Sequence, residues 1–115
     1  MCIFADEVYQ ENVYKKGAEF VSFRQVAYDI DAFGADPLQL VSFHSTSKGF
    51  VGECGLRGGY MEVLGVPSDV KDVLYKMASL SLCSNTTGQL ATGLMVNPPQ
   101  QGDASYEEYE QERTG

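Results

Sequence analysis

The stretch SFHSTSKGFVGECGLRGGY, residues 42–60, constrains the fold and the function of this chain more than any other. The run that leads into it has the composition of a buried strand, so Ser45, Ser47 and Lys48 should project from the carboxyl end of that strand. Ligands bind at this edge of α/β sheets. Hydroxyls, the backbone N–H groups of a glycine-rich loop and the guanidinium of Arg57 together suit a phosphate. A lysine beside a phosphate site is a candidate for imine formation with a carbonyl.

The order of residues in this stretch separates it from two familiar phosphate motifs. A P-loop reads GxxxxGK[ST], whereas here the lysine precedes the glycines. The GxxGxxG of residues 52–58 comes before a predicted strand and does not open a helix, so it does not indicate a dinucleotide site. Taken alone, Lys48 reads as a surface lysine and Ser45 and Ser47 as turn residues. Their combination with Arg57 and the glycines favours a phosphate site.

Asp6 and Tyr9 form a second feature, at the carboxyl end of a first predicted strand at residues 2–5. A carboxylate and a phenol at this spacing could hold a polar heterocycle from two sides. The alternative is an aspartate that caps the loop and a tyrosine that packs against its neighbours, which is the commoner fate of such residues. Glu7, between them, is interpreted as a solvated side chain or a structural hydrogen-bonding group.

The apolar periodicity predicts a βαβ unit with parallel strands, then an antiparallel strand and three further helices. The third strand should be antiparallel because the glycine-rich loop before it contains no crossover helix. Two pairs, Ser22 with Gln25 and Thr86 with Gln89, have the spacing of a helix-capping box. The predicted elements are strand 2–5, a helix from residue 22 to about 34, strands 38–43 and 59–64, and helices that begin near residues 67–69, 86 and 103–105.

Composition limits the partners that this chain can have. At 115 residues it could form one small domain, and its net charge of -8 argues against a nucleic-acid or anionic-membrane partner. No apolar run approaches the roughly 20 residues that span a bilayer. Three widely spaced cysteines and a single histidine argue against a disulfide framework and against a metal site. A reducing, cytoplasmic location is therefore expected, with a mitochondrial location as the alternative.

Three blocks of the sequence resemble the alanine aminotransferase branch of the pyridoxal-phosphate aminotransferases. They are ADEVYQ at 5–10, SFHSTSKGFVGECGLRGGYMEV at 42–63 and VNPP at 96–99. More broadly, Asp-x-x-Tyr, Ser-x-Ser-Lys and Gly-x-Arg-x-Gly-Tyr form the pattern of class-I, fold-type-I enzymes. The resemblance implies an α/β fold, part of the three-layer sandwich of the aspartate-aminotransferase-like large domain, with mostly parallel strands and one antiparallel strand. Residues 1–115 would be a segment of that cofactor-binding domain, an excerpt from a longer chain.

The resemblance also implies pyridoxal 5′-phosphate (PLP) as cofactor and a role for each candidate residue. Lys48 would be the Schiff-base lysine and the base that moves a proton between Cα and C4′. Asp6 would pair with the pyridine nitrogen, and Tyr9 would hydrogen-bond the phenolate oxygen of the ring. The phosphate would be held by Ser45, Ser47 and Arg57.

The reaction implied by the resemblance is transfer of the amino group from L-alanine to 2-oxoglutarate, giving pyruvate and L-glutamate, in a homodimer. The alternatives are another class-I enzyme, such as an aromatic aminotransferase or a lyase like aminocyclopropane-carboxylate synthase, or a non-catalytic truncated copy. The family's first phosphate loop and its substrate-carboxylate arginine are not among the matched residues. Substrate choice within the family therefore stays open at this point.

Overall fold

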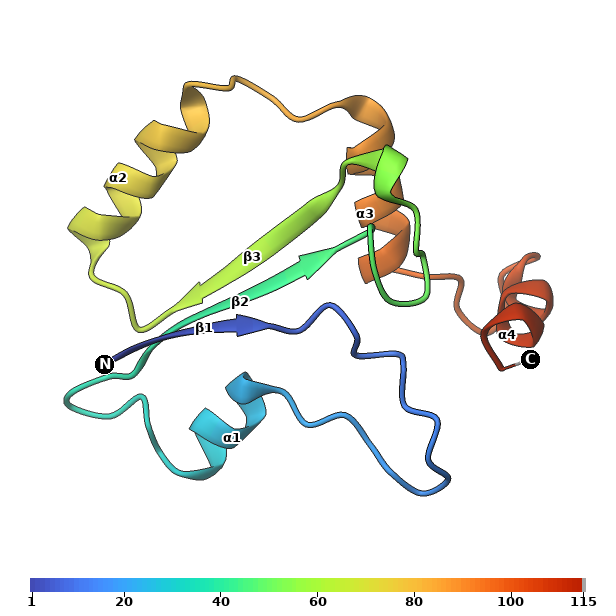
Figure 1. The fold of residues 1–115 in the computed structure, drawn as a ribbon, viewed down its shortest axis with the longest axis horizontal. Helices are drawn as coiled ribbons and strands as arrows, with labels where there is room; N and C mark the ends of the chain where they lie inside the picture. Colours follow the sequence, from blue (N-terminus) through green and yellow to red (C-terminus); the bar gives the residue numbers. More distant parts are fainter. Residues whose placement is uncertain (115) are drawn as a thin grey trace.

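The structure is a computed structural model that describes residues 1–114 as a three-stranded mixed sheet with helices around it (Figure 1). The strand order is β1-β2-β3, formed by Cys2–Asp6, Gln39–Ser45 and Gly59–Leu64. β1 and β2 are parallel, whereas β2 and β3 are antiparallel. The predicted βαβ unit and the predicted antiparallel third strand are both confirmed, and the chain is α/β as expected.

Helix α1, Phe23–Asp29, connects the two parallel strands and is shorter than predicted. Ser22 caps it as expected, because its Oγ accepts a hydrogen bond from the backbone N–H of Gln25 at 3.0 Å. The Gln25 side chain donates to Asp29 instead of returning to Ser22, so only half of the capping box forms. The predicted end near Gly34 is wrong. Asp31 takes a left-handed conformation, with φ of 54°, and this ends the helical backbone early.

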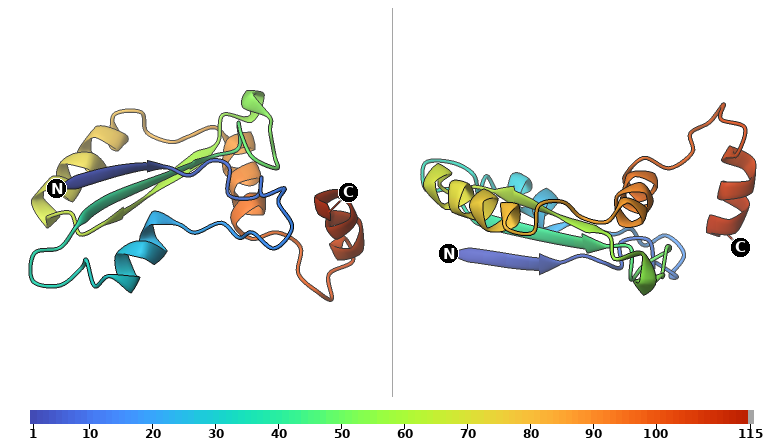
Figure 2. Two further views of the ribbon diagram at one scale, coloured as in Figure 1. Left: turned by 60° about the horizontal axis from the view of Figure 1, so that its bottom comes forward. Right: turned by 90° about the horizontal axis from the view of Figure 1, so that it is seen from above.

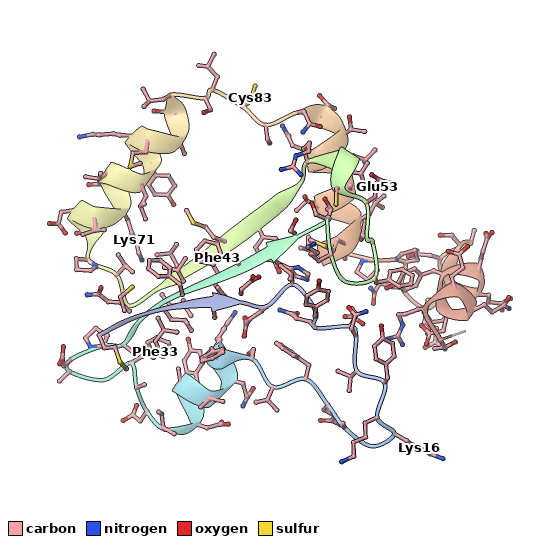
Figure 3. The ribbon with its side chains drawn as sticks, in the orientation of Figure 1. Lys16, Phe33, Phe43, Glu53, Lys71 and Cys83 are labelled. Carbon is pink, nitrogen blue, oxygen red and sulfur yellow. The ribbon has the colours of Figure 1, made fainter. Side chains whose placement is uncertain are left out.

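Register and side-chain alternation define two faces of the sheet. Ala5 and Leu40 are buried on the face that α1 covers, where Ala27 of that helix is also buried. On the opposite face, Phe4 lies beside Phe43, with ring centroids 5.9 Å apart (Figure 3). Phe4 is nevertheless 71% exposed, so this second face is largely uncovered within the described residues.

Three helices follow the sheet in the sequence: α2 is Ser68–Ser79, α3 is Thr86–Val96 and α4 is Tyr106–Thr114. α2 lies along β3, and α3 packs beside the short 3-10 helix η1, Cys54–Leu56, near the carboxyl end of β2 (Figure 1). α4 stands apart from the sheet in both further views (Figure 2). It contacts the glycine-rich loop through an edge-on pair of Phe50 and Tyr109, with centroids 5.9 Å apart.

The predicted cap of α3 is off by one residue. Asn85, and not Thr86, is the N-cap: its Oδ1 accepts the backbone N–H of Gly88 at 2.7 Å. The side chain of Gln89, the predicted capping-box partner, donates instead to the carbonyl of Ser84.

The arrangement is more open than that of a compact domain. The radius of gyration is 16.6 Å, whereas a compact chain of this length has about 13 Å. In residues 1–114 no helix is both long and apolar enough to cross a membrane. In the same part of the chain no group of three or more His, Cys, Asp or Glu side chains could hold a metal ion.

Candidate functional site

The carboxyl end of β2 brings Ser45 and Ser47 together as predicted. Ser45 is the last residue of the strand, which ends two positions later than the predicted end at residue 43. Its Oγ accepts the backbone N–H of Ser47 at 3.1 Å and donates to the carbonyl of Gly58 at 3.4 Å. Ser45 therefore lies beside Gly58, the residue that follows Arg57 in the chain, and Ser47 is joined to this contact through Ser45.

Thr46, which the sequence interpretation passed over, anchors this turn. It is fully buried, and its backbone N–H donates to the carbonyl of Gly58 at 3.1 Å. Its Oγ1 also donates to that carbonyl and accepts the Gly58 N–H. The Thr46 carbonyl accepts the N–H of Glu53 at 3.0 Å. Strand alternation gives no signal for Thr46, because β2 ends at Ser45 and Thr46 belongs to the turn that follows it.

Arg57 has a left-handed backbone, with φ of 52° and ψ of 41°. This conformation costs a non-glycine residue about 1–2 kcal/mol, so neighbouring contacts must hold it. Its guanidinium Nη1 donates to the carbonyl of Cys54 at 3.1 Å, and its own carbonyl accepts from Asn85 Nδ2 at 3.3 Å. Within residues 1–114, neither Arg57 nor Lys48 is paired with a carboxylate. Two cations that lack a counter-charge thus lie on one hydroxyl-bearing loop.

Lys48 lines a cavity of about 610 Å³ between the end of the sheet and α3. The walls are mostly apolar, and the charged groups that line it are Lys48 and Glu11. His44 and Tyr60, which share the sheet face of α1, form part of the lining. The five other candidates do not line this cavity: they are Asp6, Tyr9, Ser45, Ser47 and Arg57.

Asp6 is the last residue of β1, exposed, and paired in register with Phe43 of β2. It therefore points to the same sheet face as Ser45, opposite to α1. Tyr9 is exposed in the turn that follows β1. Within the described residues, no hydrogen bond joins the side chain of Asp6 or of Tyr9 to Lys48. Glu7 between them is buried and accepts the first N–H of α1, at Phe23, which confirms its structural interpretation.

One glycine brings the two motifs into contact. Gly49, directly after Lys48, has φ of 63°, and a Cβ atom there would lie 2.8 Å from the carbonyl oxygen of Val8. Any other residue would have to displace the backbone between Asp6 and Tyr9. The lysine turn and the aspartate–tyrosine turn are therefore packed backbone to backbone at one edge of the sheet.

His44 and Tyr60 lie opposite each other on β2 and β3, with ring centroids 5.7 Å apart. Burial lowers the pKa of His44 below its ordinary value of 6.5, partly opposed by the charges of Glu11 and Glu7. Burial, followed by the charges of Glu62 and Glu7, raises the pKa of the Tyr60 phenol. His44 Nδ1 accepts the N–H of Ser45 at 2.9 Å, which requires that nitrogen to be unprotonated.

Acidification should therefore destabilise the protein through His44. Because its pKa is lower in the folded state, the unfolded state takes up the proton first, so stability falls as pH drops below about 6.5. The His44→Asn variant offers an amide oxygen to Ser45 but does not titrate. We expect the melting temperature of the complete wild-type protein to fall between pH 7.5 and 5. The melting temperature of the His44→Asn variant should fall less over the same range. Equal pH dependence in the two proteins would contradict this.

Comparison with known proteins supports the family resemblance that the residues of this loop indicate. The model of the family "Aminotransferase class I and II" matches residues 1–115. The chain belongs to this family. It is 53% identical over its whole length to alanine aminotransferase 2, mitochondrial, of Arabidopsis thaliana, and covers 21% of that protein. It is 57% identical, over 96% of its length, to the probable mitochondrial alanine aminotransferase of Dictyostelium discoideum, again 21% of that protein. Glutamate–glyoxylate aminotransferase 1 of Arabidopsis thaliana is 44% identical over the whole chain, which spans 24% of that relative.

The chain thus spans about a fifth of the length of these aminotransferases. The mixed α/β sheet agrees with a part of the fold-type-I domain, as the sequence predicted. Family membership and the predicted fold are confirmed on these grounds.

Proposed function

We propose that the complete protein is a PLP-dependent alanine aminotransferase, which moves the amino group of L-alanine to 2-oxoglutarate. The observation that carries the proposal is the loop after β2. In a chain of this family, Lys48 and Arg57 both lack a carboxylate partner within residues 1–114, and Ser45 and Ser47 directly precede Lys48 on the same loop. The names of the relatives that share 53% and 57% identity support alanine as the amino donor.

The donor set at the end of β2 fits a phosphorylated cofactor. Phosphate recognition needs several N–H or O–H donors and a positive charge, and this loop provides Ser45, Ser47 and Arg57. PLP, when bound, supplies a ring that accepts the electron pair left when the substrate loses its α-proton. Lys48 would bind the cofactor covalently, and its amine would take up and return that proton. Its exposure and its place in a turn fixed by Thr46 suit both tasks.

Asp6 and Tyr9 would hold the ring of the cofactor. A carboxylate beside the pyridine nitrogen keeps that nitrogen protonated, because an opposite charge favours the charged form. The phenol of Tyr9 would donate a hydrogen bond to the ring oxygen. The packing of Gly49 against Val8 supports these roles for Asp6 and Tyr9, because it joins the turn that carries these two residues to the turn that carries Lys48.

Reductive labelling tests the assignment of Lys48. The complete protein is mixed with PLP, reduced with sodium borohydride and digested, and the modified peptides are identified by mass spectrometry. We expect the label on the peptide that contains Lys48, and its loss in Lys48→Arg, which keeps the charge but has no nucleophilic amine. Label recovered on Lys15, Lys16, Lys71 or Lys76 instead would contradict the assignment.

The other expectations stay predictions. The relative named for glutamate and glyoxylate has lower identity, 44%, which favours alanine but keeps glyoxylate a useful second acceptor in assays. An aromatic aminotransferase, a related lyase and a non-catalytic copy are the remaining alternatives. A homodimer is the expected assembly. Cytoplasmic location stays the sequence-based expectation, and the mitochondrial names of two relatives favour the alternative.

A further inference from the structure

We propose that Asn85 is a positioning residue for the phosphate site: its amide holds the backbone of Arg57, so that helix α3 sets the direction of the guanidinium. This inference rests on the proposed function, because it takes Arg57 as a phosphate ligand. It adds a residue from a helix outside the motif-bearing loop.

The two ends of the Asn85 amide perform different tasks. Its Oδ1 accepts the N–H of Gly88 at 2.7 Å and so caps α3. Its Nδ2 donates to the carbonyl of Arg57 at 3.3 Å, across 28 positions in the sequence. The cap alone needs only an acceptor, which Ser, Thr or Asp supplies equally well. The donor end is therefore the part that the capping role does not explain.

A pair of glycines makes this contact close. A Cβ atom on Gly88 would lie 2.7 Å from the carbonyl oxygen of Leu56 and 2.8 Å from that of Arg57. A Cβ atom on Gly58 would lie 2.6 Å from the carbonyl oxygen of Gly88. Gly88 is buried, although most of α3 is not. The first turn of α3 thus lies directly against the backbone on both sides of Arg57.

This contact matters because Arg57 has a strained backbone conformation, and that backbone sets the direction of the guanidinium that would bind the phosphate. Left-handed backbone is unfavourable for arginine, and its retention requires surrounding contacts. Within η1 and its cap, the Arg57 N–H and guanidinium both bond to the carbonyl of Cys54. The carbonyl of Arg57 is held from outside that turn, by Asn85. The N–H on the far side of the same peptide plane, that of Gly58, donates to Thr46 Oγ1 at 3.3 Å. Removal of the Nδ2 donor would leave this peptide plane held on one side only, so the direction of the guanidinium would be less closely fixed.

Two substitutions separate the cap from the donor. Asn85→Asp and Asn85→Ser both keep an oxygen that can accept the Gly88 N–H. Neither supplies the amide nitrogen: the aspartate carboxylate has no N–H, and the serine side chain is one atom shorter. The two variants differ in charge, so an effect common to both comes from the lost donor and not from a new negative charge near Arg57.

The readout is the preference for the phosphorylated compound, measured on the complete apoprotein without substrate. Dissociation constants are measured for pyridoxal 5′-phosphate and for pyridoxal, which lacks the phosphate. We expect both Asn85 variants to lose about fivefold in this preference, the value of one ordinary hydrogen bond. Binding of pyridoxal should not change. In an Arg57→Ala background, Asn85→Ser should have no further effect on the preference.

The outcomes distinguish the inference from the function on which it rests. If Arg57→Ala keeps the wild-type preference for the phosphorylated compound, the proposed role of Arg57 fails first. If Arg57→Ala loses the preference but both Asn85 variants keep it, the positioning role of Asn85 is overturned. An equal loss for both compounds in both variants, with lowered melting temperatures, shows a general folding effect and also overturns it. Loss in Asn85→Asp alone shows a charge effect and counts against the inference.

Discussion

The Asp6→Asn variant of the complete protein is expected to transfer amino groups about 10²–10³-fold more slowly than wild type while it keeps its fold. Asparagine has nearly the same shape but no charge, so it cannot keep the pyridine nitrogen of the cofactor protonated. The structure favours a functional reading of this residue, because Asp6 ends β1 exposed and no hydrogen bond to its carboxylate is found in residues 1–114. A stability change within about 0.5 kcal/mol is therefore expected.

The rate loss should lie in the proton-transfer step. Single-turnover kinetics with alanine and with alanine deuterated at Cα would show a slower reaction that is also more sensitive to the isotope. Asp72→Asn provides a matched control, because Asp72 is an exposed aspartate on α2, away from the β2 loop. It should leave the rate unchanged. An unchanged rate in Asp6→Asn, together with a lower melting temperature, would support the alternative that Asp6 only caps its loop.

The strands could be predicted from the sequence because their signals are local. Apolar runs marked both parallel strands, and the lack of a crossover helix in the glycine-rich loop required the antiparallel third strand. The ends of the helices were harder to predict. Asp31 ends α1 by taking a left-handed backbone conformation. Aspartate adopts this conformation more readily than most residues, but no residue pattern in the sequence predicts that it does so at this position.

The cap of α3 shows why a local rule can choose the wrong residue. Thr86 and Gln89 have the spacing of a capping box, and Asn85 is an equally good cap by residue type. The structure selects Asn85 because the first turn of α3 must lie against Arg57, which places Gly88 in contact with two loop carbonyls. A contact across 28 positions decides between two adjacent residues that the sequence ranks alike.

In the candidate site, too, some contacts could be predicted from the sequence and others could not. The motif predicted Ser45, Ser47 and Arg57 as neighbours, and the structure joins Ser45 to Gly58, directly after Arg57, and joins Ser47 to Ser45. Thr46, which fixes that turn from the inside, could not be predicted, because it follows the end of β2 and meets its partners Gly58 and Glu53 only in the folded chain. The position of Asp6 on the face opposite to α1 required the strand register, which the sequence does not contain.

Residues 1–115 alone are expected to show neither a cooperative unfolding transition nor amino transfer. Their accessible surface is 8733 Å², whereas a compact monomer of this mass exposes about 6,200 Å². Phe4, Leu90 and Met77 are between 62% and 71% exposed. Apolar surface of this extent requires further protein to cover it.

The buried core is too small to replace that cover. Its hydrophobic members are Ala5, Ala27, Leu40 and Val41, two of them alanines, and burial of side chains so few and so small offsets little of the chain entropy lost on folding. The purified segment should therefore bind a hydrophobic dye, melt without a sharp midpoint, and form no pyruvate from alanine and 2-oxoglutarate above a Lys48→Arg control. A sharp calorimetric transition, together with steady turnover that depends on Lys48, would show that the segment is self-sufficient and that its exposed apolar faces need no partner surface.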